Sequence, residues 1–285
     1  MLTLAQLFWG GNFVVGRWAA GQVPPMTLAL LRWTGAVLLV LPFAWGALKR
    51  DWPTIRRHLP ILVLLGITGP GLFNTVQYIS LTMTTALSAA VINSSGPVLI
   101  ALACLALFGD RIRPLQAFGI LVSLSGVLAV VTQGRPLAIL DLGFNRGDLV
   151  MLGAMAIWAV YTAFLRKRPD LHWLSFAAVQ YLVAAAVNLP LAAFEMSRGA
   201  YPSFTPQTVA ALAYVAVLPS LVSYALYARG VTLIGGPRAG SFMHLIALFA
   251  GLMAMVFLGE QPQIYHLVGF ALILAGVSLA ARTNM

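Results

Sequence analysis

The sequence is poor in charge: 8% of its 285 residues are Asp, Glu, Lys or Arg, whereas 60% are hydrophobic. A typical soluble domain carries roughly a quarter charged residues. This deficit leaves too few charged side chains to cover a surface that faces water, and the mean hydropathy of +0.91 agrees. Most of the chain is therefore expected to lie in lipid.

Cysteine and catalytic motifs are also scarce. The single cysteine, Cys104, lies in an apolar run, which excludes an intramolecular disulfide and offers no cysteine-based metal site. The sequence contains no GxSxG, HExxH, CxxC or phosphate-loop pattern. We therefore expect a protein that is not an enzyme and that binds neither a metal nor a cofactor.

Acidic residues are absent from the middle of every apolar segment. The seven acids, all in loops or near segment ends, are Asp51, Asp110, Asp141, Asp148, Asp170, Glu195 and Glu260. Proton relays within a membrane commonly use buried carboxylates, so such a relay, or a site for organic cations, is not expected. His244 could titrate or bind a substrate, although we favour the alternative of a neutral, hydrogen-bonded histidine that serves packing.

The hydrophobic residues form long runs that are apolar on every face, which predicts membrane-spanning helices rather than the alternating strands of a barrel. The fold class predicted is an all-α membrane protein with ten transmembrane helices. They are expected near residues 2–21, 26–47, 59–81, 85–108, 113–132, 147–165, 172–194, 207–229, 236–258 and 263–281.

Basic residues outnumber acidic ones by 17 to 7, giving a net charge of +10, and they divide unequally between the two sides of the predicted membrane. Twelve lie on one side: Lys49, Arg50, Arg56, Arg57, Arg111, Arg113, Arg166, Lys167, Arg168, Arg229, Arg238 and Arg282. Four lie on the other: Arg17, Arg135, Arg146 and Arg198. By the positive-inside rule both termini are expected in the cytoplasm, and nucleic acid is not an expected partner.

The two halves of the sequence look alike. Phe108-Gly109-Asp110, Gly119 and Gly126 recur 150 positions later as Leu258-Gly259-Glu260, Gly269 and Gly276, while Trp9 and Trp158 differ by 149 and Pro42 and Pro190 by 148. Each half contains five predicted spans, so the second half must enter the membrane from the opposite side. The sequence thus predicts two inverted repeats, 1–133 and 147–285, joined by 134–146, around a central cavity.

Particular motifs carry a resemblance to a known family. Trp9-Gly10, Pro25 followed by Leu31-Arg32, Pro97, and the closing pattern from Gly109-Asp110 to Gly126-Val127 resemble one repeat of the EamA-type branch of the drug/metabolite transporter superfamily. The second half matches chiefly at its ending, Gly259-Glu260 to Gly276-Val277. Within the branch, the chain is similar to YddG-like amino-acid exporters. The resemblance implies a basket of ten helices with the fifth and tenth spans at the periphery.

Polar and aromatic residues recur at helical spacing inside the apolar segments, and in a membrane such residues usually face a cavity or another helix. The candidate substrate-binding residues are Trp9, Asn12, Asn74, Gln77, Tyr78, Trp158, Tyr161, Tyr224, Tyr227 and His244. The alternative is structural, since amides can join helices and Trp and Tyr can sit at the membrane interface. For the whole set we favour a cavity.

Three further features have more than one interpretation. Arg32 could reach the membrane interface, anchor a helix end or meet a substrate carboxylate, and we favour anchoring. The break expected at Gly96-Pro97 could expose carbonyls to a substrate or be a simple kink satisfied by Ser95. The glycine pairs Gly119/Gly126 and Gly269/Gly276 are expected to allow close helix packing.

Taken together, the sequence predicts a secondary transporter in a bacterial inner membrane that exports small metabolites, best neutral or aromatic amino acids, by alternating access. The alternatives are a carrier for drugs or another metabolite, a channel, and a non-transporting membrane scaffold. The expected partners are a small-molecule substrate and the lipid bilayer, and a monomer is the working expectation.

Overall fold

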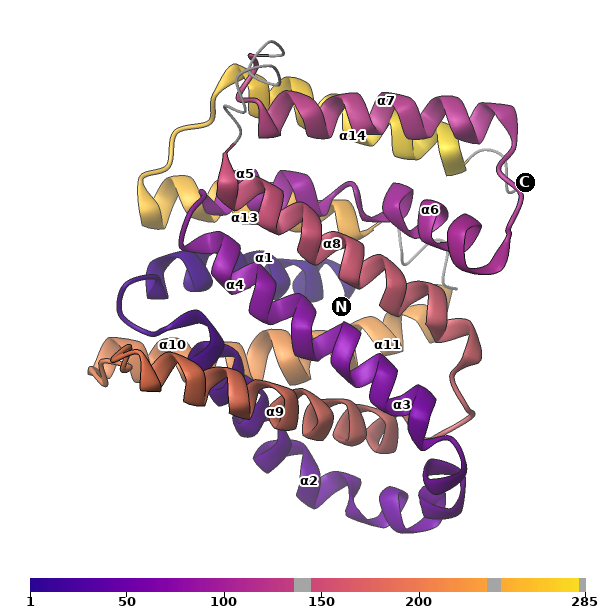
Figure 1. The fold of residues 1–285 in the computed structure, drawn as a ribbon, viewed down its shortest axis with the longest axis vertical. Coiled ribbons are helices and arrows are strands. Elements are labelled where there is room, and N and C mark those ends of the chain that lie inside the picture. Colours follow the sequence, from indigo (N-terminus) through magenta and orange to yellow (C-terminus); the bar gives the residue numbers. More distant parts are fainter. Residues whose placement is uncertain (136–144, 235–241, 282–285) are drawn as a thin grey trace.

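The computed structural model describes residues 1–135, 145–234 and 242–281, and every regular element in these ranges is helical (Figure 1). The α-helices are α1 (Leu2–Ala19), α2 (Pro25–Arg57), α3 (Leu59–Gly66), α4 (Asn74–Leu81), α5 (Ala86–Asn93), α6 (Gly96–Phe108), α7 (Pro114–Val131), α8 (Arg146–Phe164), α9 (Trp173–Ser197), α10 (Pro206–Val217), α11 (Ser223–Ile234), α13 (Leu245–Leu258) and α14 (Ile264–Ala281). Most of the predicted connection 134–146, the start of the predicted ninth span at 236–241, and Asp141, Arg238 and Arg282 lie outside the described residues.

The predicted spans fall on helices or on consecutive helical segments wherever the structure describes them. Residues 59–81 form α3, a π-helix and α4 in unbroken succession, and the predicted fourth span is divided into α5 and α6. Helix α2 continues beyond the predicted end of the second span near residue 47 and ends at Arg57. The charged residues from Lys49 to Asp51 end the apolar run but do not stop a helix.

By length and composition, six helices in the described ranges could cross a membrane, or seven if the bent pair α5–α6 is one span. Two shorter apolar helices, Phe242–Leu258 and Ile264–Ala280, accompany them. The chain is therefore a multi-pass helical membrane protein, whereas ten crossings remain a prediction.

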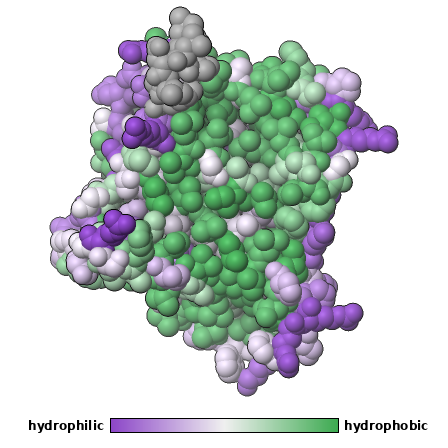
Figure 2. All heavy atoms as spheres, viewed as in Figure 1, coloured by the Kyte–Doolittle hydropathy of each residue, from purple (hydrophilic) through white to green (hydrophobic). Residues whose placement is uncertain are grey.

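The surface agrees with a lipid environment. Figure 2 shows hydrophobic residues filling the middle of one face and hydrophilic ones gathered at its left and right margins. Large apolar side chains are among the most exposed, including Leu38 at 68%, Phe43 at 77% and Val256 at 76%. Such extensive apolar exposure would be costly in water, and lipid tails remove that cost.

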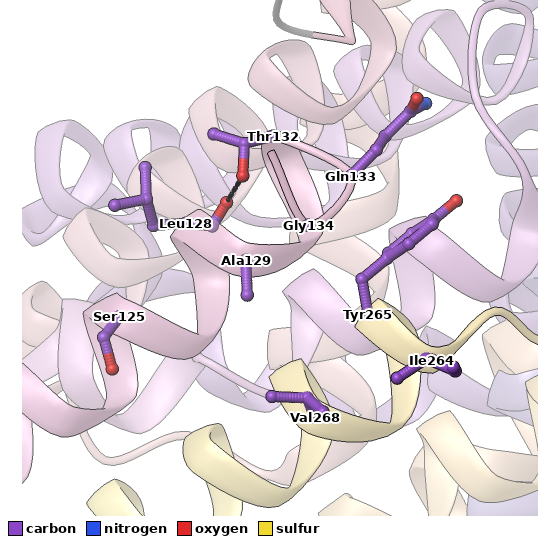
Figure 3. A pocket seen from close by; sticks show the side chains of 9 residues that line it. All are labelled: Ser125, Leu128, Ala129, Thr132, Gln133, Gly134, Ile264, Tyr265 and Val268. Carbon is purple, nitrogen blue, oxygen red and sulfur yellow. Dashed lines mark hydrogen bonds between the residues drawn. The ribbon is translucent and has the colours of Figure 1, made fainter. Parts of the chain in front are cut away.

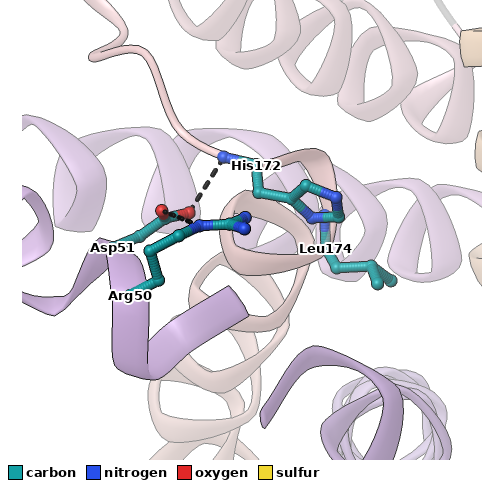
Figure 4. Close-up of polar contacts among 4 residues, drawn as sticks. All are labelled: Arg50, Asp51, His172 and Leu174. Carbon is teal, nitrogen blue, oxygen red and sulfur yellow. Dashed lines mark hydrogen bonds and ion pairs between the residues drawn. The ribbon is translucent and has the colours of Figure 1, made fainter. Parts of the chain in front are cut away.

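Contacts at one pair of helix ends show that α2 and α9 run in opposite directions (Figure 4). Oδ2 of Asp51, near the C-terminal end of α2, accepts a hydrogen bond from the backbone N–H of His172 at 2.9 Å, directly before α9 begins. Nδ1 of His172 accepts from the backbone N–H of Leu174 at 3.3 Å and so caps α9. Oδ1 of Asp51 pairs with Nε of Arg50 at 3.5 Å.

Helices α7 and α14 lie side by side at one edge of the molecule (Figure 1) and touch through glycines. A Cβ added to Gly126 would lie 2.6 Å from the carbonyl oxygen of Gly269, and one added to Gly119 would lie 2.6 Å from that of Gly276. Any side chain there would separate the backbones. The prediction that these glycines allow close packing is confirmed.

Candidate functional site

Two helices near the centre are interrupted by π-helical segments, and each segment holds a proline. η1 (Ile67–Phe73) joins α3 to α4 and contains Pro70, while η4 (Leu218–Val222) joins α10 to α11 and contains Pro219. Proline has no N–H to donate, so the helical hydrogen bonds around it must rearrange. π-Helical turns occur frequently at functional sites. The two prolines differ by 149 positions, which matches the spacing between the sequence halves.

Predicted site residues donate to the backbone at both interruptions. The indole Nε1 of Trp9 donates to the carbonyl oxygen of Pro219 at 2.9 Å. The amide Nδ2 of Asn74 donates to the carbonyl oxygen of Pro70 at 3.3 Å. Because buried carbonyl groups need donors, the irregular segments fix the positions of these two side chains.

Arg32 of α2 forms the hub of a buried hydrogen-bond network, with a side chain only 2% exposed. Its Nε donates to Ser220 Oγ at 2.8 Å. Its Nη1 lies 2.7 Å from Asn74 Oδ1, 2.9 Å from the Tyr78 hydroxyl and 3.1 Å from Asn12 Oδ1. The Tyr78 hydroxyl in turn donates to Asn12 Oδ1 at 2.7 Å. The network joins α1, α2, α4 and η4.

The location of Arg32 decides one of the alternatives left open by the sequence. A guanidinium that reached the membrane interface would be exposed at its tip, so the observed burial excludes that interpretation. Arg32 also does more than anchor one helix end, because it contacts three other elements.

One aromatic group is built around Trp9. Its ring meets Tyr224 edge-on, with centroids 5.4 Å apart and planes at 81°, and lies 5.4 Å from the ring of Tyr227. Tyr224 is 6.3 Å from Tyr181, which lies 5.0 Å from Trp33. Edge-to-face and offset arrangements are those that aromatic rings prefer. The group therefore forms a continuous row of ring contacts across α1, α2, α9 and α11.

A second aromatic group is centred on Trp158 of α8. Its ring lies 4.9 Å from both Tyr161 and Phe73. Tyr161 packs against Gly69 of η1, where an added Cβ would come within 2.6 Å of the ring. The π-helical segment thus leaves room for a large aromatic side chain.

Eight of the ten predicted residues take part in these contacts: Trp9, Asn12, Asn74, Tyr78, Trp158, Tyr161, Tyr224 and Tyr227. Gln77 is 1% exposed, and its Oε1 has no hydrogen-bond partner among the described residues. His244 ends η5 (Phe242–His244), which packs against α1, and its imidazole ring makes no hydrogen bond within the described ranges. That all ten face one substrate cavity stays a prediction.

Sequence reasoning missed part of the site. It did not select Trp33, Tyr181 or Phe73, and it treated Arg32 as an anchor. A signal was available for two of them, because Trp33 and Tyr181 differ by 148 positions, as Pro42 and Pro190 do.

Two serine hydroxyls donate to backbone carbonyl groups at the break in the predicted fourth span. The axes of α5 and α6 differ by 47°. Ser95 Oγ donates to the carbonyl oxygen of Ile92 at 2.7 Å, and Ser94 Oγ donates to that of Ala90 at 3.3 Å. These bonds favour the interpretation of a kink over that of a substrate-binding backbone.

The acids keep to helix ends and loops in the part of the chain that the structure describes, as predicted. Asp148, in the first turn of α8, is nevertheless only 1% exposed. One carboxylate oxygen accepts from the Thr84 hydroxyl, and the other has no partner among the described residues. The same ranges contain no cluster of His, Cys, Asp or Glu that could hold a metal ion.

A hollow of about 500 Å³ lies between α7 and α14 (Figure 3), and no residue of the Arg32 network lines it. It is lined by Ser125, Leu128, Ala129, Thr132, Gln133, Gly134, Ile264, Tyr265 and Val268. The Thr132 hydroxyl is already bonded to the carbonyl oxygen of Leu128 at 2.8 Å. None of the lining residues belongs to the predicted site.

Apolar helices arranged around a buried polar and aromatic centre define an integral membrane protein with a polar interior. The chain belongs to the EamA-like transporter family, whose sequence profile matches residues 1–132 and 145–282.

Similar proteins carry transporter names. An uncharacterized transporter of Archaeoglobus fulgidus is 29% identical, covering 98% of this chain and 95% of its own. The probable terminal-alkyne amino-acid exporter of Streptantibioticus cattleyicolor is 24% identical, covering 100% and 93%. The threonine/homoserine exporter RhtA of Escherichia coli is 26% identical, covering 80% and 73%. A crystal structure with 20% identity matches with a TM-score of 0.63 over 100% of this chain and 98% of that one, so the fold is shared.

Proposed function

We propose that the protein is a secondary transporter of a bacterial inner membrane that exports small metabolites, with neutral or aromatic amino acids as its best substrates. Two relatives are named as amino-acid exporters, which supports the substrate class. The proposal also agrees with the scarcity of charge at the site, where Arg32 is surrounded by amides, hydroxyls and aromatic rings.

One observation carries the proposal: side chains from distant parts of the chain converge on a buried polar network bordered by aromatic rings. A hydrogen bond from an amide or hydroxyl contributes about 0.5–1.5 kcal/mol. An ammonium group against Trp or Tyr contributes about 0.5–2 kcal/mol. Rings such as Trp9 and Trp158 can also bury an apolar side chain. These are the groups that a zwitterion with an apolar side chain requires.

Alternating access between two inverted five-helix repeats, 1–133 and 147–285, is the mechanism that we propose. The twofold match of the family profile and the paired prolines Pro70 and Pro219 support this division. In this proposal the ten spans place both termini in the cytoplasm, and the two repeats rock about the site that they share.

Transport by the purified protein in liposomes tests the proposal. The solutes are L-threonine, L-homoserine, L-phenylalanine and propargylglycine, with ethidium as a drug-like cation and protein-free liposomes as the control. We expect saturable amino-acid uptake that is accelerated when unlabelled solute is present inside. Uptake without saturation or counterflow would indicate a channel, movement of ethidium alone would indicate a drug carrier, and no movement of any solute would contradict the transporter proposal.

A further inference from the structure

The charge of Arg32 is unusual among the buried groups of this protein. The side chain is 2% exposed, and the hydrogen-bond acceptors around it are the neutral side chains of Asn12, Asn74, Tyr78 and Ser220. Within the described ranges the ion pairs are those of Arg50 with Asp51 and Arg166 with Asp110, so no carboxylate of these ranges balances the charge. A buried cation without a counter-ion is costly, and an anion that bound beside it would remove that cost.

The guanidinium also has donors to spare. Its Nε and Nη1 make all four hydrogen bonds of this side chain to described residues. Its Nη2 has no acceptor among those residues. A guanidinium carries five N–H donors in a planar fork whose geometry matches a carboxylate. Nη2 therefore leaves two N–H groups for a ligand.

The surroundings of the guanidinium indicate what the rest of that ligand should be. Its Cζ lies 4.5 Å from the centroid of the Trp33 ring and 6.0 Å from that of Tyr78. Trp33 begins the row of rings that continues through Tyr181 to Tyr224. A solute with a carboxylate at one end and an apolar group at the other matches this order of charge and ring.

A purely structural role of Arg32 would not require a charged side chain, as the corresponding residue in the second half of the chain shows. The residue 148 positions after Arg32 is Gln180, which is 3% exposed and donates to the carbonyl oxygen of Leu62 at 3.0 Å. A neutral side chain thus serves for packing at the corresponding place in the second half. The positive charge occurs in one half only, which argues for a role in recognition.

We propose that Arg32 is the carboxylate-recognition residue of this transporter, with Nη2 donating to the substrate carboxylate while Asn12, Asn74, Tyr78 and Ser220 hold the guanidinium in place. The assignment rests on the proposed function. It adds to that proposal that the substrates are carboxylates, which the protein prefers to the corresponding amides.

Calorimetric titration of the purified protein tests the assignment with three matched pairs of solutes. These are L-phenylalanine and L-phenylalaninamide, L-threonine and L-threoninamide, and benzoate and benzamide. Wild type should bind the acid of each accepted pair about tenfold to a hundredfold more tightly than the amide, as expected for a charge-assisted hydrogen bond. Arg32→Gln should lose this preference.

Arg17→Gln is the control, because Arg17 is a half-buried arginine whose Nη1 donates to the carbonyl oxygen of Leu81 at 2.9 Å. It should retain the preference for acids. Gel filtration reports whether each variant folds. If Arg32→Gln does not fold, Arg32→Lys takes its place, since lysine keeps the charge but loses the planar fork, and its preference should be reduced.

The outcomes separate this inference from the proposed function. Amino-acid counterflow in liposomes with no preference for acids over amides would overturn the role of Arg32 and leave the transporter proposal intact. An Arg32-dependent preference for benzoate in a protein that moves no amino acid would support Arg32 as a carboxylate site and overturn the amino-acid proposal. An unchanged preference in a folded Arg32→Gln or Arg32→Lys variant, or no binding of any carboxylate by wild type, would overturn the inference.

Discussion

Glu195 of α9 caps the N-terminus of α2 through Thr27. Its Oε2 accepts from the backbone N–H of Thr27 at 2.8 Å and from the Thr27 hydroxyl at 3.0 Å, while Oε1 accepts from the backbone N–H of Met26 at 3.0 Å. At the opposite ends of the same helices, Asp51 of α2 accepts from His172 before α9. Each helix thus supplies an acid to the N-terminus of the other, where the helix dipole favours negative charge.

Replacement of Glu195 by alanine should destabilise the protein by about 1–3 kcal/mol, because it removes a charged acceptor and leaves two N–H groups of α2 without partners. The measurement is thermal unfolding in detergent. Asp170→Ala is the control, since Asp170 is an exposed acid of the loop before α9, and its melting temperature should match that of wild type. Equal effects of the two substitutions would contradict the capping role.

Gly126→Leu should reduce the yield of folded protein, because a Cβ at this position would already lie 2.6 Å from the carbonyl oxygen of Gly269. Overpacking typically costs about 1–3 kcal/mol, and a backbone in the way leaves less room for relaxation. Gly153→Leu provides the control, since nothing lies within 4 Å of a Cβ added to Gly153 of α8. Gel-filtration profiles that are alike for both variants would show that α7 and α14 can separate without cost.

The ion pair between Asp110 and Arg166, 2.6 Å apart, should make stability depend on pH. Hydrogen bonding to the Arg166 guanidinium lowers the pKa of Asp110 from its ordinary value of 3.8. A depressed folded-state pKa means that the contribution is fully present above the ordinary value and is lost as the pH falls through the folded-state pKa. Both side chains are partly exposed, so the effect should be small and weakened by salt.

Comparison of Asp110→Asn with wild type measures this contribution. The variant should melt at a slightly lower temperature at pH 7. The difference should shrink as the pH falls from the ordinary value of 3.8 toward the lowered pKa of Asp110, because the carboxylate of the unfolded chain takes up its proton first. A difference that stays constant across this range would show that the charge of Asp110 is irrelevant to stability.

The helical elements could be predicted from the sequence because a membrane helix satisfies its own backbone, so an apolar run and a helix nearly coincide. The exception at α2 shows the limit of this argument, since the residues from Lys49 to Asp51 are charged and still helical. The candidate residues could be predicted for a similar reason. Asn74 and Tyr78 share a helix face at i and i+4, and that relation needs no knowledge of the neighbouring helices.

What could not be predicted depends on contacts between helices. Whether Arg32 points toward lipid, the interface or the interior is decided by Asn12, Asn74 and Ser220, which lie far from it in the sequence. The presence of Pro70 predicts an irregular helical turn. The π-helical form of that turn depends on local hydrogen bonding, which cannot be deduced from composition. Tertiary partners therefore determine the part of the site that the sequence left open.

Loss of one contact at the site should weaken substrate affinity roughly threefold to thirtyfold, since ~1.4 kcal/mol corresponds to tenfold. Tyr78→Phe removes a hydroxyl that accepts from Arg32 and donates to Asn12, and Trp158→Ala removes a ring that packs against Tyr161. Both should lower the affinity measured in liposome uptake while expression stays near that of wild type. Transport that is unchanged in both variants would remove these residues from the site.

The orientation in the membrane leads to the last prediction, which uses the two ends of α9. Asp170 lies in the loop before this helix, and Tyr201, 69% exposed, lies in the loop after it. Arg166, Lys167 and nearby basic residues precede α9, so the positive-inside rule places Asp170 in the cytoplasm and Tyr201 outside.

Thiol labelling in intact cells tests this orientation, and the chain offers a clean background because Cys104 is its single cysteine. In a Cys104→Ser background, Tyr201→Cys should react with a membrane-impermeant maleimide added to intact cells. Asp170→Cys should react only after the cells are permeabilised, which also shows that its thiol is accessible. The reverse pattern would invert the proposed topology, because a single helix separates the two positions and must place them on opposite sides of the membrane. Labelling of both positions in intact cells would mean that α9 does not cross the membrane at all. The second repeat would then lack the predicted span 172–194.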